Sequence, residues 1–210
     1  MNTRDDFRNT LLHSAAYFGK LDIVKYLVEQ KNLSLELKDN SEMTALHKAV
    51  RNGKLNVAKY LADEKKASIS GKDIYNRNLL HQAVIGNNLD VMKFLVDDMK
   101  MSPFIEELNF FNRTVAMEAA KYGALPILRY LVDEKHASIL TVDEEGCTLL
   151  HIAARENYLP IVKYLVEEKS FDINAMTSTN RTAYDLAVSH DADASLLEYL
   201  EKKMSEHNSI

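Results

Sequence analysis

The stretch Thr10-Leu11-Leu12-His13-Ser14-Ala15-Ala16-Tyr17-Phe18-Gly19 decides the fold, because it returns along the chain in related forms. Its first four residues recur as TALH at 44–47, NLLH at 78–81 and TLLH at 148–151, and more loosely as TVAM at 114–117 and TAYD at 182–185. The last residues of these segments are 34, 34, 36, 34 and 34 apart. A period of about 20–50 residues indicates tandem structural repeats, so this chain is expected to be an array of six units.

Two further positions agree across the units. The second residue after each segment is always alanine: Ala15, Ala49, Ala83, Ala119, Ala153 and Ala187. The sixth residue is always of a type that tolerates a left-handed backbone: Gly19, Gly53, Asn87, Gly123, Asn157 and Asp191. A helix commonly ends at such a residue, so the pattern predicts a short first helix of about ten residues in every unit, with Thr10 or its equivalent as the N-cap.

A second helix is predicted after each of these stops, as in Leu21–Glu29. Its polar residues Asp22, Lys25 and Glu29 follow one ridge and the rest are apolar, so the helix must be packed between neighbours. The same ridge recurs in the other units at Asn56/Lys59/Asp63, Asp90/Lys93/Asp97, Pro126/Arg129/Asp133 and Pro160/Lys163/Glu167.

These features resemble the ankyrin repeat, whose pattern is D-x-x-G-x-T-P-L-H-x-A-A-x-x-G followed by a second helix. The resemblance covers about residues 5–203 and implies an all-α repeat solenoid, in which each unit has two antiparallel helices and a β-hairpin finger. Asp39, Asp73 and Asp143 stand at the family's finger aspartate, and Asn76, Asn112 and Asn180 can replace the turn glycine that only Gly146 keeps. The proline of T-P-L-H is absent from every unit, and two extra residues near Met101–Leu108 leave that loop's geometry open.

The expected organisation is a single ankyrin repeat domain over residues 1–203. Its units are placed at about 5–38, 39–72, 73–108, 109–142, 143–176 and 177–203, followed by a frayed tail at 204–210. The array is expected to be complete, with a polar last unit, and to be a monomer.

Net charge, cysteine count and hydrophobicity exclude several classes of protein. The net charge of −5 argues against general binding of nucleic acid, and the single cysteine excludes a disulfide framework or a multi-cysteine metal site. No apolar run approaches the roughly 18 residues of a membrane span, and the polar N-terminus predicts no secretory signal. A cytoplasmic protein is therefore expected, the alternative being a protein exported into a host cell.

No catalytic, cofactor or metal site is expected. The repeated histidines occupy equivalent positions of stacked units, roughly 10 Å apart, and so cannot share a metal ion. Lysines follow Gly19 and Gly53 without a phosphate-loop pattern, and Cys147 has no histidine or basic neighbour in sequence to activate it. The sequence predicts no catalytic residue, no cofactor and no metal.

Positions whose residue type differs between units are not constrained by the packing of one repeat on the next. In the ankyrin family these are the finger tips and the exposed end of the first helix, which line a concave groove. Carried onto this chain, the resemblance implies the following partner-binding residues: Tyr17, Phe18, Met43, Arg51, Ile74, Tyr75, Arg77, Phe110, Phe111, Arg113, Lys121, Tyr122, Arg155 and Arg181. Aromatic residues and arginine at the middle of a patch are typical of binding hot spots.

The resulting hypothesis is a non-enzymatic module that binds a partner polypeptide through this groove, as an adaptor or an inhibitor. An acidic or an apolar partner segment would suit the mixture of arginines and aromatics. The alternatives are an exported bacterial effector that mimics a eukaryotic ankyrin protein and an architectural spacer. An enzyme is the least favoured alternative, because the sequence offers no recognisable pair of residues for acid–base or nucleophilic catalysis.

Overall fold

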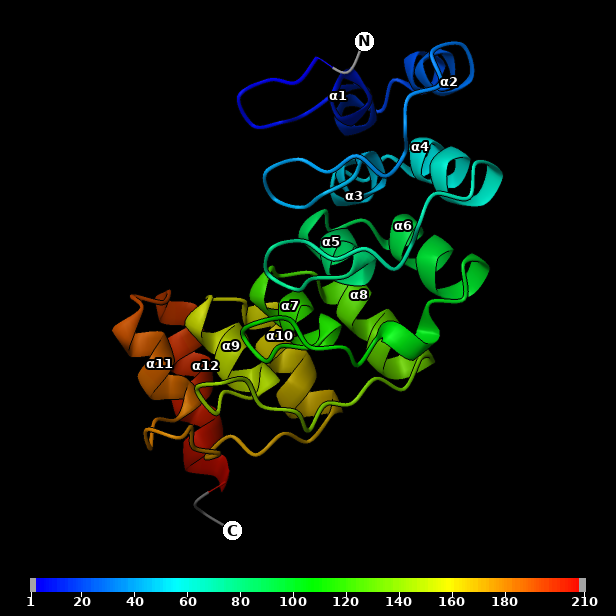
Figure 1. The fold of residues 1–210 in the computed structure, drawn as a ribbon. Helices are drawn as coiled ribbons and strands as arrows, with labels where there is room; N and C mark the ends of the chain where they lie inside the picture. The colour runs from blue at the N-terminus through cyan, green and yellow to red at the C-terminus, as the bar shows by residue number, and fades with distance from the viewer. Residues whose placement is uncertain (1–2, 208–210) are drawn as a thin grey trace. The chain divides into compact units, whose positions relative to one another are not determined.

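The computed structural model describes residues 3–207, and over this range the chain folds into pairs of short antiparallel helices joined by extended loops (Figure 1). It divides into two compact units, Met1–Phe110 and Phe111–Ile210, which are described separately below. The only β pairing recorded in the described residues is one isolated antiparallel bridge between Arg4 and Thr10.

The first unit holds three helix pairs and the start of a fourth repeat. Its first helices are α1 (Leu11–Phe18), α3 (Ala45–Arg51) and α5 (Leu79–Ile85). Its second helices are α2 (Leu21–Glu29), α4 (Leu55–Lys59) continued by η1 (Tyr60–Glu64), and α6 (Leu89–Lys93) continued by η2 (Phe94–Asp98). The first helices have 7 or 8 residues, so the expected length of about ten was too long.

The second unit repeats this arrangement. Its first helices are α7 (Val115–Lys121), α9 (Leu149–Arg155) and α11 (Ala183–Ser189). Its second helices are α8 (Leu125–Arg129) with η4 (Tyr130–Glu134), α10 (Leu159–Lys163) with η5 (Tyr164–Glu168), and α12 (Ala194–His207). Because α12 continues to His207, the expectation of a frayed tail from residue 204 is wrong for residues 204–207, and residues 208–210 lie outside the described range.

The predicted stops of the first helices are confirmed by their backbone angles. Gly19, Gly53 and Gly123 have φ of 71°, 66° and 69°, and the non-glycine stops Asn87, Asn157 and Asp191 also have positive φ. At Gly123 a side chain is excluded as well, because an added Cβ would lie 2.4 Å from the Tyr158 ring.

The second helices from the second to the fifth repeat end in a wider turn than an α-helix has. The N–H of Lys65 donates to the carbonyl of Tyr60 at 3.0 Å, and Lys135 bonds to Tyr130 in the same way at 3.2 Å, which are the i to i+5 bonds of a π-helix. Each wide turn leads into a left-handed residue, such as Lys66 with φ 57°. The hydrophobic pattern predicted the helix but not this widening of its last turn.

The fingers are turns rather than β-hairpins. Asp39 donates its N–H to the carbonyl of Met43 at 3.0 Å, and Asp73 and Asp143 bond to Arg77 and Cys147 in the same way, but no ladder extends beyond this pair in the described residues. The β-hairpin implied by the family resemblance is therefore not formed as strands here. The reason is local: the Asp carboxylate takes the remaining N–H groups of the turn, as described below.

The loop whose geometry was open is short and anchored. It forms a 3-10 turn, η3 (Ser102–Phe104), between the buried side chains of Met101 and Ile105. The two extra residues of this repeat are thus absorbed before the finger, and the frame of the next repeat is unaffected.

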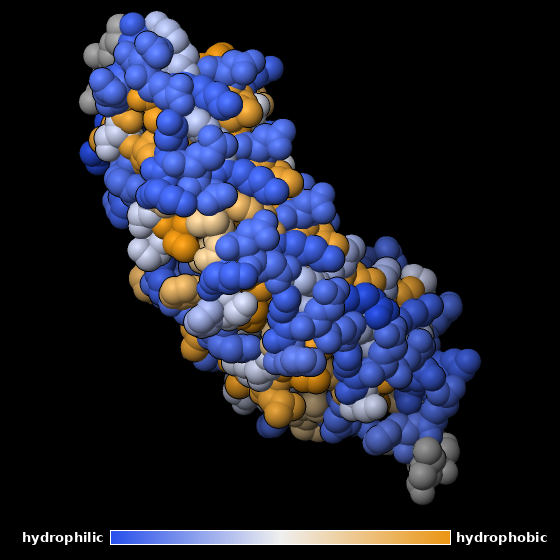
Figure 2. Space-filling model, turned by 90° about the vertical axis from the view of Figure 1, so that its right-hand side faces the viewer, coloured by the Kyte–Doolittle hydropathy of each residue, from blue (hydrophilic) through white to orange (hydrophobic). Residues whose placement is uncertain are grey.

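The core lies between the helix pairs of each unit, as the single polar ridge predicted. Val57, Leu61, Val91 and Leu95 are at most 1% exposed, whereas the ridge residues Asn56, Lys59 and Asp63 face solvent. On the face that Figure 2 shows, hydrophilic side chains predominate and hydrophobic ones gather in small groups between them.

Replacing Leu95 by alanine is expected to lower the free energy of unfolding by about 2–5 kcal/mol, because the side chain is completely buried between repeats. Thermal denaturation followed by circular dichroism measures the effect. Asp98→Ala, on the exposed side of the same helical turn, is the control and should change the stability by less than about 0.5 kcal/mol. Equal melting of both variants would contradict the assigned packing of η2.

Replacing Glu42 by glycine is expected to stabilise the chain by about 0.5–1 kcal/mol. Glu42 holds a left-handed φ of 60° at the finger position where the fifth repeat has Gly146. Its ion pair with Lys38 is exposed and contributes little. The reverse substitution, Gly146→Ala, should be destabilising, since an added Cβ would also lie 2.7 Å from the amide nitrogen of Ser178.

Candidate functional site

Five of the fingers are built on one side chain that binds the backbone of its own turn. The Oδ1 atom of Asp39 accepts the N–H groups of Ser41 and Met43 at 2.8 and 2.9 Å, and Asp73 and Asp143 do the same in their fingers. Asp5 takes this part in the first finger, and the Thr177 hydroxyl takes it in the last. These bonds fix the turn, so the residues at its tip are held in place without contributing to the core.

Basic side chains form ion pairs with the finger aspartates. Asp39 is 4% exposed and its carboxylate lies 2.6 Å from Lys48 Nζ. Burial alone would raise the pKa of Asp39, but the lysine and the backbone donors outweigh it and hold the pKa below the usual range. The finger of the third repeat uses Arg77 and Gln82 for Asp73.

In the first unit the finger tips are joined in a row. The N–H of Asn40 donates to the carbonyl of Phe7, that of Ile74 to Ser41, and that of Phe110 to Tyr75, at distances of 3.0 to 3.1 Å. The row exposes four large apolar side chains, with exposed fractions of 70% for Phe7, 43% for Ile74, 42% for Tyr75 and 67% for Phe110. We call these four residues the finger-tip row.

A shallow hollow lies beside the row, on the first repeat. It has a volume of about 260 Å³ and is lined by Asn9, His13, Ser14, Tyr17, Phe18 and Lys48. The rings of Tyr17 and Phe18 pack edge to face with centroids 4.9 Å apart, and both remain largely exposed. A side chain of a bound segment could therefore enter next to Tyr17.

The second unit brings fewer of the expected residues to its surface. Phe111 is 37% exposed and lies near the Arg113 guanidinium, while Lys121 and Tyr122 are half-buried and form a cation–π pair at 5.7 Å. Arg155 is bound to Glu145 at 2.8 Å, and Arg181 donates to the Asp185 carbonyl and to the Ser189 hydroxyl.

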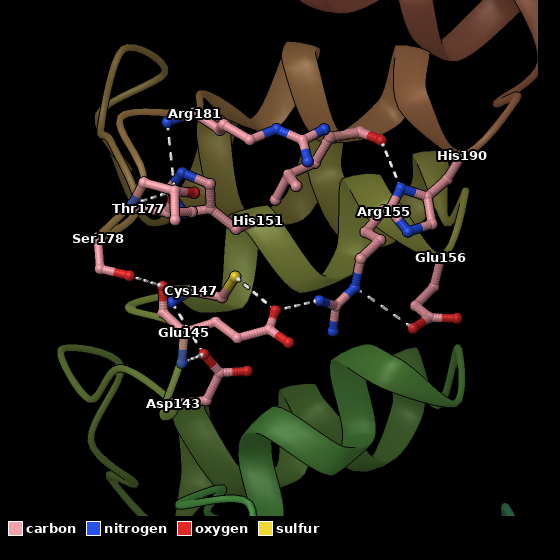
Figure 3. A network of polar contacts seen from close by, with 12 residues as sticks. Asp143, Glu145, Cys147, His151, Arg155, Glu156, Thr177, Ser178, Arg181 and His190 are labelled. Carbon is pink, nitrogen blue, oxygen red and sulfur yellow. Dashed lines mark hydrogen bonds and ion pairs between the residues drawn. The ribbon is translucent and has the colours of Figure 1, made fainter.

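Figure 3 shows the polar network around the fifth finger, which includes the only cysteine of the chain. Cys147 is buried, and burial raises the pKa of its thiol to about 11, so it is protonated at neutral pH and is a poor nucleophile. Asp143, Glu145 and Cys147 bring possible ligand atoms within 4.8 Å of one another. Both oxygens of Asp143 are already used by N–H donors, from the backbone and from Arg113, so the group is better explained as support for the finger.

Three of the repeated histidines, in α1, α3 and α9, connect the first helix to the following loop. His13 accepts the Thr10 N–H at Nδ1 (3.1 Å), within a reciprocal capping box, and its Nε2 lies 3.0 Å from the carbonyl of Met43. His47 and His151 are placed identically, with Nε2 at 3.1 and 3.0 Å from the carbonyls of Gly71 and Ala175. This network assigns a neutral ring with the proton on Nε2, and it gives these histidines a structural role.

The sequence matches the family description "Ankyrin repeats (3 copies)" over residues 1–73, 64–143 and 117–209, which together span nearly the whole chain. The chain is an ankyrin repeat protein. No curated protein is similar enough in sequence to count as a relative.

A solved structure supports the fold of this ankyrin repeat protein. A chain of the complex between a predatory endopeptidase from Bdellovibrio bacteriovorus and an immunity protein superposes with a TM-score of 0.74 and 24% sequence identity. The match covers 96% of this chain and 100% of that one. In residues 3–207 no helix has the length and apolar character that a membrane crossing requires.

Two of the residues expected to contact a partner lie in the interior of the ankyrin repeats. Met43 is 2% exposed, because it follows the finger turn and points into the repeat rather than toward the tip. Arg113 is 6% exposed, because its guanidinium binds the Asp143 carboxylate at 2.9 Å. The expectation that Met43 and Arg113 are accessible is wrong. Four further arginines of the expected set are partly buried: Arg51, Arg77, Arg155 and Arg181.

Exposed apolar residues outside the expected set were missed. Leu140 and Met176 in the second unit are 87% and 63% exposed, and Leu11, Ile23 and Tyr26 in the first repeat are each more than half exposed. Leu11, Ile23 and Tyr26 could have been found from the sequence, because positions of this kind are buried in an array only where another repeat precedes them.

Protonation of the buried histidines is expected to destabilise the protein between pH 7.5 and pH 5. Burial lowers the pKa of His13, His47 and His151 below that of an exposed histidine. The unfolded chain therefore binds protons near pH 6.5 that the folded chain does not, and stability falls as the pH drops through that value. Urea denaturation at a series of pH values measures the slope.

The triple variant His13→Gln, His47→Gln, His151→Gln is the control for this titration. It should unfold more easily at pH 7.5 but lose less stability between pH 7.5 and pH 5 than the wild type. The carboxylates with lowered pKa titrate below this window and therefore do not set the slope. An unchanged slope in the variant would mean that these three histidines are not its cause.

Proposed function

We propose that this ankyrin repeat protein is a non-enzymatic interaction module that binds a segment of a partner polypeptide against its finger tips and first helices. The observation that carries the proposal is the finger-tip row, in which Phe7, Ile74, Tyr75 and Phe110 are exposed on turns held by hydrogen bonds. A folded chain gains nothing from ordering large apolar side chains in water, so such a row is best explained by a partner that covers it.

The charges around the fingers favour an apolar partner segment over an acidic one. Two of the arginines that would attract an acidic peptide are already paired, Arg77 with Asp73 and Arg155 with Glu145. Arg77 also lies over the Tyr75 ring, 4.6 Å from its centroid, and thereby holds the ring in position. The partner would then be recognised by side chains that fill the hollow beside Tyr17 and pack on the row.

An inhibitor is the narrower form of this proposal. The solved complex named above contains an endopeptidase and an immunity protein, and its similarity to this chain concerns the fold. Occlusion of another protein's site is compatible with an exposed row that has no chemistry of its own.

The double variant Ile74→Ser, Phe110→Ser tests the proposal. Partners captured by affinity pull-down with the wild-type protein and identified by mass spectrometry should bind this variant at least about thirty-fold more weakly, equivalent to about 2 kcal/mol, when titrated individually. The melting temperature should move by less than about 2 °C, because both side chains are exposed.

The matched control is Asn56→Ala with Asp90→Ala, two exposed residues of the second helices of the same unit. It should leave partner binding intact. Equal binding by the wild type and the finger-tip variant would refute the proposal. Loss of binding in the control alone would favour an architectural role of the opposite face.

A further inference from the structure

The outer face of the first repeat carries side chains that are buried at the same positions of the later repeats. Leu11, Ile23 and Tyr26 are 56%, 51% and 51% exposed. Their counterparts in the second repeat, Ala45, Val57 and Tyr60, are each 1% exposed, because the first repeat packs on them. The described residues that precede α1 leave this face open.

The open face is also concave. A hollow of about 250 Å³ lies between α1 and α2 and is lined by Leu11, Ser14, Ala15, Phe18, Lys20, Ile23 and Leu27. Most of these side chains are apolar, and Leu27 is itself nearly buried at the bottom. The hollow is therefore shaped to receive apolar side chains, as the interior faces are.

The interior faces combine apolar packing with a carboxylate bound by a tyrosine and a lysine. The Tyr60 hydroxyl donates to Glu29 Oε1 at 3.1 Å, and Lys65 Nζ lies 2.9 Å from the same oxygen. The second unit repeats this contact, with Tyr164 and Lys169 at 2.8 and 2.5 Å from Asp133. In both cases the carboxylate comes from the second helix of the preceding repeat.

The first repeat has the same tyrosine and lysine but no preceding repeat in the described residues. Tyr26 and Lys31 stand 34 positions before Tyr60 and Lys65. Lys31 Nζ lies 5.1 Å from the centroid of the Tyr26 ring, as Lys65 lies 5.3 Å from that of Tyr60. The pair is thus already arranged as it is where a carboxylate is bound, and we call Tyr26 and Lys31 the carboxylate clamp.

We propose that the outer face of the first repeat is a second interaction surface, which binds an amphipathic helix of a partner protein. The helix would place an Asp or Glu side chain on the carboxylate clamp and apolar side chains in the hollow beside Leu11 and Ile23. This surface is distinct from the finger-tip row and needs no part of it.

A second copy of this chain fits the face less well than such a partner. Stacking head to tail would bring the last repeat against it. Where the fifth repeat buries His151, the last repeat has the exposed and charged Asp185, and its long helix exposes Lys202. Burying these charges against the hollow is unfavourable, and Lys202 would approach Lys31 instead of a carboxylate.

The probe for this surface is a fluorescent peptide with the sequence of residues 21–37, held helical by a side-chain lactam because so short a helix is marginal alone in water. It contains Glu29, the carboxylate that occupies the equivalent interior site. Fluorescence polarisation should show saturable binding to the full-length protein. The peptide with Glu29→Gln should bind about tenfold more weakly.

Variants of the protein then locate the contact. Tyr26→Phe with Lys31→Met should weaken binding of the acidic peptide about tenfold and leave binding of the Glu29→Gln peptide unchanged. Ile23→Asp should weaken both peptides, and the finger-tip variant Ile74→Ser, Phe110→Ser should bind both normally. Because Ile23 and Tyr26 are exposed, melting temperatures should stay close to that of the wild type.

Three results would overturn the inference: no saturable binding of the acidic peptide, equal binding of the two peptides, or indifference of the acidic peptide to the Tyr26/Lys31 variant. Self-association detected by sedimentation velocity and removed by Ile23→Asp would also overturn it, since a second copy would then occupy the face. These outcomes leave the finger-tip proposal untouched, because its variants and its partners are different.

Discussion

A single repeat of this chain cannot bury both of its faces, and the other features of the structure follow from this constraint. The second helix is apolar on every side except one ridge, so each helix pair needs a neighbour before and after it. The alanines and leucines that recur every 34 or so residues are the residues that neighbours share. Stability is therefore distributed over interfaces, while positions away from them are free to differ.

Polar contacts fix the register of this stacking. The histidine at the start of a first helix bonds to the following loop, and the tyrosine of a second helix bonds to a carboxylate of the repeat before it. Apolar packing alone would tolerate sliding, whereas these bonds are satisfied in one arrangement only. The finger aspartates act within one turn in the same way, and they hold the tips rigid at no expense to the core.

The repeat frame, the helix pairs and the left-handed stops could be predicted from the sequence, because each rests on local rules that recur several times. The π-helical ends and the missing finger strands could not, since they depend on where turn amides and carbonyls find partners in space. For the site, exposure of Ile74, Tyr75 and Phe110 was predicted correctly. Arg113 and Met43 were misplaced, because variation between repeats reveals freedom from stacking but not whether a side chain has an ion-pair partner or points inward.

The same constraint explains why two different surfaces remain open. The finger tips are open because stacking does not need them, and their exposed apolar residues are the basis of the proposed partner-binding surface. The outer face of the first repeat is open for the opposite reason: stacking would use it, and it retains the tyrosine, the lysine and the apolar hollow of an interior interface. The last repeat has a polar residue, Asp185, where an interior repeat buries His151. The two terminal repeats are thus chemically different, and the proposed helix-binding surface lies on the first of them.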